Sequence, residues 1–202
     1  TDRLKSELMA LGAYARSLSA DLESGLAGPV GRTLEFDFEG EYWRLSGTLT
    51  GLRENGLVRY RYDNGSPWDF LDGWIRHLFL NACRPEGILC RSVWHFRDEK
   101  TELGPVEDAE ERLRDLVAIY RTGLCRPLHF FPRPAWEYIS NGHRLDKAAD
   151  MWRESNDGEN DVFNRLAMRG VDNPVDGEFA DLAGRVFGPF FAHKTGETHE
   201  GA

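Results

Sequence analysis

The chain has 202 residues, a formal net charge of −9 and a pI near 5.2. Its length fits one domain, or one domain with a helical appendage. The acidic balance argues against strong autonomous binding to nucleic acid, which usually needs a basic face, and no apolar run is long enough to cross a membrane.

The N-terminus and the cysteines bear on the compartment. The start, Thr1 to Leu4, lacks the apolar core of a signal peptide, and the missing initiator Met is typical of an excised or processed chain. Cys83, Cys90 and Cys125 form an odd set without a CxxC pair. Their spacing indicates no zinc site and fits a reducing compartment, so we expect a cytoplasmic protein.

The first predicted elements are a helix and a β-meander. Apolar residues recur at steps of four and three over 2–23 and predict an amphipathic helix, which a Gly- and Pro-containing segment at 24–29 ends. Strands follow over 33–38, 42–50 and 57–62, joined by turns at 39–40 and 54–56. Such short connections imply antiparallel pairing of all three strands. The apolar stripe of the helix consists of Leu4, Leu8, Leu11, Ala15, Leu18 and Leu22.

The remaining elements indicate an α/β (α+β) fold. A helix over 68–82, a strand over 88–96, a helix over 107–123 and a short final strand over 127–131 are predicted in turn. From Pro132 the pattern becomes helical, over 134–140, 144–153, 161–168 and 178–191, with a frayed tail from 193 to 202. We therefore predict a mixed sheet flanked by helices in a core of residues 1–131, with residues 132–202 as a helical C-terminal extension packed on the same domain.

The strand at 57–62 carries an alternation of arginine and tyrosine. Because strand side chains alternate, Arg59 and Arg61 point to one face. Periodicity alone favours an ordinary hairpin with two solvent-facing arginines. The runs 47–52 and 57–62 also resemble the two core strands of a RecB-type, restriction-endonuclease-like nuclease. In that family the first strand ends in a metal-binding Asp and the second carries Asp-x-Lys, and these positions fall on Thr50, Arg59 and Arg61.

Those replacements bear directly on catalysis. Phosphodiester hydrolysis at such a site needs carboxylates, because Mg²⁺ prefers oxygen ligands, and an arginine at the first position of Asp-x-Lys repels the metal. Asp63 falls on the same strand face as Arg59 and Arg61 and could therefore offer a displaced carboxylate. Because it stands beside Asn64-Gly65, it is better explained as a turn residue. The alternating acids Glu35 to Glu41 are better explained as a solvated strand face. We therefore expect no catalytic residue, no metal and no cofactor.

Other sequence motifs give no competing chemistry. The chain contains no HExxH, GxSxG, Walker A or GxGxxG motif, so neither a metalloprotease nor an ATPase is indicated. His77 is expected at the boundary of the core. In the C-terminal part, Trp136 and Trp152 are flanked by cationic residues, and core packing competes there with a partner or DNA contact. The flanking cations are Arg133, Arg144, Lys147 and Arg153.

Several short segments carry a wider resemblance through their order and spacing. From about Arg32 to Phe191 the chain resembles the C-terminal domain of the gamma subunit (RecC) of bacterial exodeoxyribonuclease V, the RecBCD helicase–nuclease. The segments are GLVRYR at 56–61, WIRHL at 74–78, LVAIYRTGL at 116–124, RPL at 126–128, KA at 147–148 and FGPFF at 187–191.

This resemblance implies a restriction-endonuclease-like fold without catalytic residues, inside a complex that unwinds and degrades duplex DNA ends. It implies the beta (RecB) and alpha (RecD) subunits as partners, with DNA bound in the context of the holoenzyme. The favoured hypothesis is a non-catalytic scaffold and interaction domain. The alternative is an active metal-dependent exonuclease with carboxylates displaced to Asp63 and the 35–41 strand. An autonomous DNA-binding module is the hypothesis that the net charge favours least.

Overall fold

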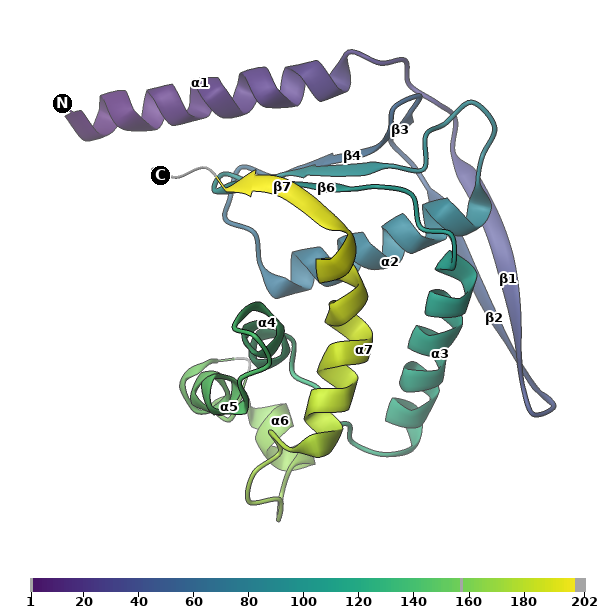
Figure 1. Cartoon of the computed structure of the whole chain (residues 1–202), viewed down its shortest axis with the longest axis vertical. Coiled ribbons are helices and arrows are strands. Elements are labelled where there is room, and N and C mark those ends of the chain that lie inside the picture. The colour runs from purple at the N-terminus through teal and green to yellow at the C-terminus, as the bar shows by residue number, and fades with distance from the viewer. Residues whose placement is uncertain (1, 157, 199–202) are drawn as a thin grey trace. The chain divides into compact units, whose positions relative to one another are not determined.

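The computed structural model describes residues 2–156 and 158–198 (Figure 1). None of the described helices is both long and apolar enough to cross a membrane. The helices are α1 (Asp2–Leu22), α2 (Pro67–Cys83), α3 (Ala109–Cys125), α4 (Pro132–Ser140), α5 (Leu145–Glu154), α6 (Val162–Ala167) and α7 (Gly177–His193). The strands are β1 (Val30–Phe38), β2 (Glu41–Leu49), β3 (Leu52–Arg53), β4 (Gly56–Tyr60), β5 (Ser92–His95), β6 (Glu99–Leu103) and β7 (Lys194–Thr198).

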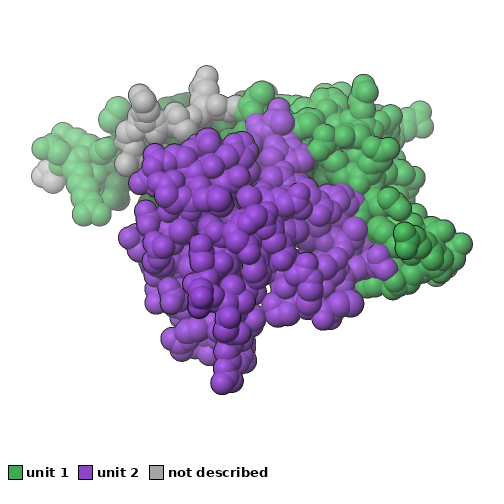
Figure 2. Space-filling model, turned by 60° about the horizontal axis from the view of Figure 1, so that its bottom comes forward, with its two compact units in different colours: residues 1–114, 193–202 green, residues 115–192 purple. Residues whose placement is uncertain are grey.

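The chain divides into two compact units, coloured green and purple in Figure 2. Unit 1 comprises Thr1–Arg114 and His193–Ala202, and unit 2 comprises Asp115–Ala192. The division falls within α3, and the chain returns to unit 1 for β7. The boundary that the sequence predicts between residues 131 and 132 lies inside unit 2.

Unit 1 is built on a five-stranded sheet of order β3-β4-β5-β6-β7. Strands β4 and β5 are parallel, with Leu57 opposite Ser92 and Tyr60 opposite His95, and the other neighbouring strands are antiparallel. Parallel neighbours need a crossover connection, which α2 provides. The mixed sheet that the sequence predicts is confirmed.

Helices α1 and α2 lie on opposite faces of this sheet (Figure 1). On the α1 face, the ring of Tyr14 lies 5.0 Å from that of Tyr62, edge to face. On the α2 face, Gly73 lets the helix approach the sheet closely, because an added Cβ would lie 2.3 Å from the Trp94 ring. His77 on α2 is fully buried, so our expectation of a boundary position is wrong.

The N-terminal half of α1 leaves its apolar stripe uncovered. Leu4, Leu8 and Leu11 are 63%, 60% and 44% exposed, and the one buried residue of this helix is Asp21 near its end. The predicted helix is confirmed as α1. Only its C-terminal half packs against the sheet.

Strands β1 and β2 form a separate two-stranded sheet, in register from Val30 opposite Leu49 to Phe38 opposite Glu41. The predicted meander is therefore wrong at its third strand, since β4 pairs with β3 and β5 instead of β2. The chain changes direction at Gly51, whose φ of 71° is in the left-handed region that glycine tolerates. This turn separates the hairpin from the larger sheet.

Three strand predictions need correction. The apolar run 127–131 is not a strand but an irregular segment that leads into α4, whose first and third residues are Pro132 and Pro134. The strand predicted over 88–96 is shorter, Ser92–His95. Strands β6 and β7 were not predicted, and β7 occupies part of the tail that we expected to fray; residues 199–202 of that tail lie outside the described part.

Unit 2 is helical and has an aromatic core. The rings of Phe131 and Trp152 are 4.1 Å apart, and Phe131 also stacks near Phe179 on α7. Both phenylalanines are almost fully buried. The helices predicted after Pro132 are confirmed as α4, α5, α6 and α7.

Candidate functional site

Arg59 and Arg61 lie at the carboxyl end of β4. The ladder to β5 continues past Tyr60, because the Arg61 amide donates a hydrogen bond of 2.9 Å to the His95 carbonyl. Both arginines point to the α2 face, whereas Tyr62 points to α1. The alternation predicted from the sequence is confirmed.

A pocket of about 220 Å³ lies where these arginines meet α2. It is bounded by the carboxyl ends of the parallel strands β4 and β5 and by the first turns of the crossover helix. In open α/β sheets, ligands commonly bind in this position. The pocket is lined by Arg59, Tyr60, Arg61, Asp69, Asp72, Gly73, Trp94, His95 and Phe96.

Each carboxylate in this pocket has an arginine partner. Arg61 forms an ion pair with Asp69 at 2.8 Å. Asp69 also caps α2, since its carboxylate accepts the backbone N–H of Ser66 at 3.0 Å. Asp72 pairs with Arg76 at 2.7 Å, and this hydrogen bond raises the pKa of Arg76.

Arg59 differs from Arg61. Its side chain is exposed and makes no hydrogen bond or ion pair with any residue in the described part of the chain. One cation of the pocket is thus neutralised by Asp69, and the other faces solvent. Over residues 2–156 and 158–198, no group of three or more His, Cys, Asp or Glu side chains is arranged to hold a metal ion.

The structure does not bring Thr50 into this pocket. Thr50 is exposed and precedes Gly51 in the turn, and the β3–β4 ladder begins only at Leu52, opposite Leu57. Asp63 is also exposed, and its carboxylate accepts the amide N–H of Asn64 at 2.8 Å. It therefore caps its own turn, as the sequence indicates.

The acids of residues 35–41 lie on the separate hairpin. Glu35 pairs across the hairpin with Arg44 at 2.9 Å, and Glu41 accepts the indole N–H of Trp43 at 2.8 Å. Asp37 accepts the amide N–H of Gly40 in the hairpin turn. These contacts agree with a solvated strand face.

A second cluster of charges, not predicted from the sequence, lies on the α1 face. The Asp21 carboxylate, near the end of α1, accepts hydrogen bonds from Nε2 of His95 at 3.0 Å and from Nζ of Lys100 at 2.9 Å. The Glu102 carboxylate accepts hydrogen bonds from Arg91 at 2.7 Å and from Lys100 at 2.8 Å. Two carboxylates thus share an arginine, a lysine and an imidazole.

The pKa values in this cluster are shifted by burial and by the neighbouring charges. Burial opposes ionisation of Asp21, but hydrogen bonds from Lys100 and His95 hold its pKa below the usual value. Burial lowers the pKa of His95 despite the neighbouring carboxylate, so its imidazole is neutral and donates from Nε2. The cluster fastens the end of α1 to β5 and β6 and leaves no carboxylate uncompensated.

The sequence matches one protein family, described as the RecC C-terminal domain, over residues 4–143. The chain belongs to this family. The RecC family is part of the exodeoxyribonuclease V (RecBCD) complex, which acts in DNA repair together with other subunits. Among curated proteins, no sequence matches the chain closely enough to count as a relative.

The RecC C-terminal match covers α1 to the end of α4 and therefore contains the Arg59–Arg61 pocket and the Asp21 cluster. It begins earlier than the resemblance that we drew from Arg32, because it includes α1. It ends at His143, so the segments 147–148 and 187–191 lie outside the matched range.

The C-terminal candidates lie on α4 and α5 in unit 2. Trp136 packs against the rings of Phe187, Phe190 and Phe191 at 4.6–5.6 Å, and Trp152 is 6% exposed. Both rings therefore contribute to the core of unit 2. The cations lie around α5 and are exposed: Arg144 pairs with Asp146, Arg153 pairs with Asp150, and Lys147 has no ion pair within the described residues.

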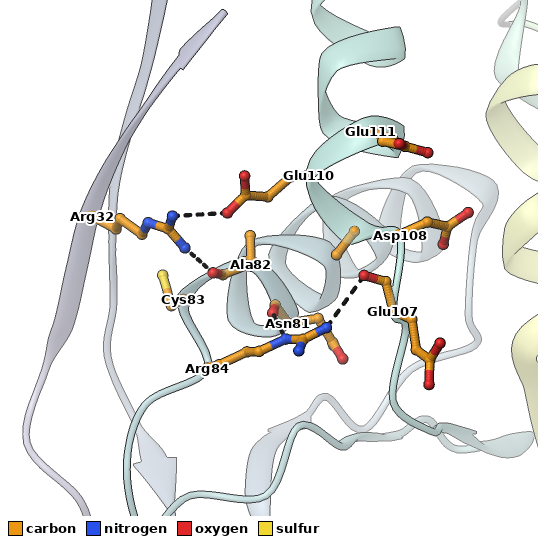
Figure 3. A pocket seen from close by; sticks show the side chains of 10 residues that line it. Arg32, Asn81, Ala82, Cys83, Arg84, Glu107, Asp108, Glu110 and Glu111 are labelled. Carbon is orange, nitrogen blue, oxygen red and sulfur yellow. Dashed lines mark hydrogen bonds and ion pairs between the residues drawn. The ribbon is translucent and has the colours of Figure 1, made fainter.

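A larger pocket of about 690 Å³ lies in unit 1 between the end of α2 and the start of α3 (Figure 3). Arg32 of β1 reaches across it to the Glu110 carboxylate at 2.8 Å and to the Ala82 carbonyl. Arg84 donates to the Glu107 carbonyl at 3.2 Å. Both guanidinium groups are thus engaged in joining the hairpin, α2 and α3.

Proposed function

We propose that this RecC C-terminal domain is a non-catalytic scaffold and interaction domain of the gamma subunit of exodeoxyribonuclease V. It supports subunit assembly and DNA strand handling in double-strand break repair and recombination, in the cytoplasm. The proposal includes a restriction-endonuclease-like fold, supported by the antiparallel β3–β4 pair that is followed by α2 and the parallel strand β5.

The observation that carries the proposal is the ion pair between Arg61 and Asp69 in the pocket beside β4. A metal-dependent nuclease needs carboxylates that are free to bind Mg²⁺. Here Asp69 is held by Arg61 and by the α2 cap, and Asp72 is held by Arg76. The exposed guanidinium of Arg59 adds a positive charge that disfavours a cation in the pocket.

The first prediction concerns cleavage. The purified chain, incubated with end-labelled linear single-stranded or duplex DNA and Mg²⁺ or Mn²⁺, is expected to give no more product than the same reaction with EDTA. Gel electrophoresis over a range of protein concentrations measures the amount of product. The comparison needs Asp63→Asn and Thr50→Ala variants purified in the same way, because a contaminating nuclease would cleave equally in all preparations.

Metal-dependent cleavage that disappears in either variant would contradict the proposal. Loss in Asp63→Asn would favour the alternative, an active exonuclease with a displaced carboxylate. Cleavage that persists equally in both variants would be traced to the preparation by activity-gel separation, and the assay would be repeated on the cleared protein.

The second prediction concerns assembly. The tagged chain is expected to retain the beta (RecB) and alpha (RecD) subunits in a pull-down from co-expressed subunits. Reversing the charge at Lys147 on α5 is expected to reduce retention several-fold if this face meets an acidic partner surface, because like charges at an interface are costly. Lys5→Glu on α1 is the matched charge reversal, because Lys5 is also exposed on a helix and has no ion pair within the described residues. Equal retention by wild type and Lys147→Glu would remove α5 from the interface.

A further inference from the structure

Two exposed tyrosines lie at the end of β4. Tyr60 and Tyr62 are 61% and 44% exposed. They are two residues apart, so both side chains leave the chain on the same side, the one that α1 partly covers. Tyr14 of α1 contacts the edge of the Tyr62 ring at 5.0 Å, which fixes one ring and leaves much of its surface in solvent.

One guanidinium group without a carboxylate partner in the described part of the chain lies near these rings, that of Arg97. Arg97 is held beside the turn that follows Tyr62, since its amide donates 2.9 Å to the Asp63 carbonyl. Its guanidinium donates only to the neutral Asn64 Oδ1, at 2.9 and 2.6 Å. Arg59 and Arg61, on either side of Tyr60 in the sequence, point to the other face of the sheet.

We propose that Tyr60 and Tyr62, with Arg97, form a binding surface for single-stranded DNA. Unpaired bases stack on the two phenol rings, and the Arg97 guanidinium contacts a phosphate beside them. The inference rests on the proposed role in DNA strand handling and gives it a place in the fold. We call these three residues the tyrosine surface.

The chemistry of the surface favours a single strand over other partners. Aromatic rings accept any base by stacking, but the bases of a duplex are stacked on one another and offer no free face. The Arg97 guanidinium donates only to a neutral amide oxygen within the described residues, and a guanidinium group matches a phosphate well. The nearby carboxylate of Asp63 is engaged by the Asn64 amide, which limits its repulsion of the backbone. The net charge of −9 makes the expected affinity modest and strongly dependent on salt.

The test is fluorescence anisotropy with the whole 202-residue chain. The probes are a labelled oligothymidine of about 16 nucleotides and a duplex of the same length, at about 50 mM salt. Tyr60→Ala and Tyr62→Ala are each expected to weaken single-strand binding about 5- to 150-fold, the range for one lost stacking partner. Arg97→Ala is expected to reduce the slope of log K against log salt by about 0.7.

The matched control is Tyr42→Ala, because Tyr42 is 76% exposed on the separate hairpin and its loss should leave binding unchanged. Circular dichroism confirms that each variant is folded. The proposal is overturned if the wild-type chain does not bind the oligothymidine, if duplex binds at least as tightly, or if both tyrosine variants bind like wild type. It is also overturned if the tyrosine variants bind the oligothymidine like wild type but bind an acidic peptide such as polyglutamate more weakly. That result would identify the surface as a protein interface.

Failure of this inference and failure of the proposed function have different signatures. If the chain neither cleaves DNA nor binds the oligothymidine, the non-catalytic role stands and the tyrosine surface is contradicted. If the chain cleaves DNA in a metal-dependent way and binds it through Tyr60 and Tyr62, the tyrosine surface stands and the non-catalytic role is contradicted.

Discussion

Replacing Gly56 with alanine is expected to lower the free energy of unfolding by about 2–5 kcal/mol, from backbone strain and overpacking together. Gly56 has a φ of 113°, which L-residues rarely adopt. An added Cβ would lie 2.1 Å from the Arg91 carbonyl oxygen, a backbone atom that cannot rotate away. The same carbonyl accepts the Leu57 amide at 2.9 Å, so the clash breaks the first rung between β4 and β5. Urea denaturation followed by circular dichroism measures the loss.

Gly40→Ala separates the two causes. Gly40 has a φ of 91° in the hairpin turn, but nothing lies within 4 Å of an added Cβ. Its substitution should therefore cost only the conformational strain, about 1–2 kcal/mol. Equal losses at Gly40 and Gly56 would show that the contact with Arg91 contributes nothing, and would contradict the close approach of β4 and β5.

The comparison of these two glycines shows what the sequence can predict. Both turns are evident from Glu39-Gly40 and Asn55-Gly56, because glycine supplies the positive φ that tight turns need. The close approach of Gly56 to Arg91 is not evident, because it depends on β4 pairing with β5. That pairing is parallel and non-local, and the alternation of β4 is equally compatible with an antiparallel neighbour.

Strands β6 and β7 were missed for a related reason. In β6, Lys100 and Glu102 face the Asp21 cluster, while Thr101 and Leu103 are buried on the other face. The polar face is thus not a solvated face, and the strand lacks the apolar alternation that identifies strands in a sequence. Strand β7 is an edge strand that follows α7 without a loop, and its residues are polar.

The candidate site was predicted in part. The shared face of Arg59 and Arg61 follows from the period of two in a strand. Their carboxylate neighbour Asp69 was not predicted, because in the sequence it is only a favourable acid in the first turn of a helix. Only the crossover brings the start of α2 to the carboxyl end of β4 and makes a capping residue the partner of Arg61.

His77 gives the protein a pH dependence that the sequence does not reveal. Its Nε2 lies 2.9 Å from the Gly104 carbonyl, which can only accept, so Nε2 carries the proton. Nδ1, 2.8 Å from the Ser92 hydroxyl, must then accept. The neutral imidazole satisfies both contacts, and burial lowers the pKa of His77 from 6.5 to about 4.

Because the folded pKa lies below the unfolded value, the unfolded chain binds the proton more readily between pH 4 and 6.5. The contribution of neutral His77 to stability is therefore complete above pH 6.5 and is lost as the pH falls towards 4, by up to about 3 kcal/mol. In His77→Gln, the side-chain amide can still donate to the Gly104 carbonyl but does not titrate. The stability difference between wild type and this variant should thus shrink as the pH falls from 7 to 4.5.

Urea denaturation of both proteins at pH 4.5, 5.5 and 7 measures that difference. At pH 7 the variant should be less stable by about 1–3 kcal/mol, because it loses the acceptor for Ser92 and the ring stacked on Trp74. His143→Asn is the control, since it removes an exposed histidine and asparagine tolerates the φ of 65° at that position. Parallel stability curves for wild type and His77→Gln would show that His77 has the same pKa in the folded and the unfolded chain, and would contradict its burial as a neutral imidazole.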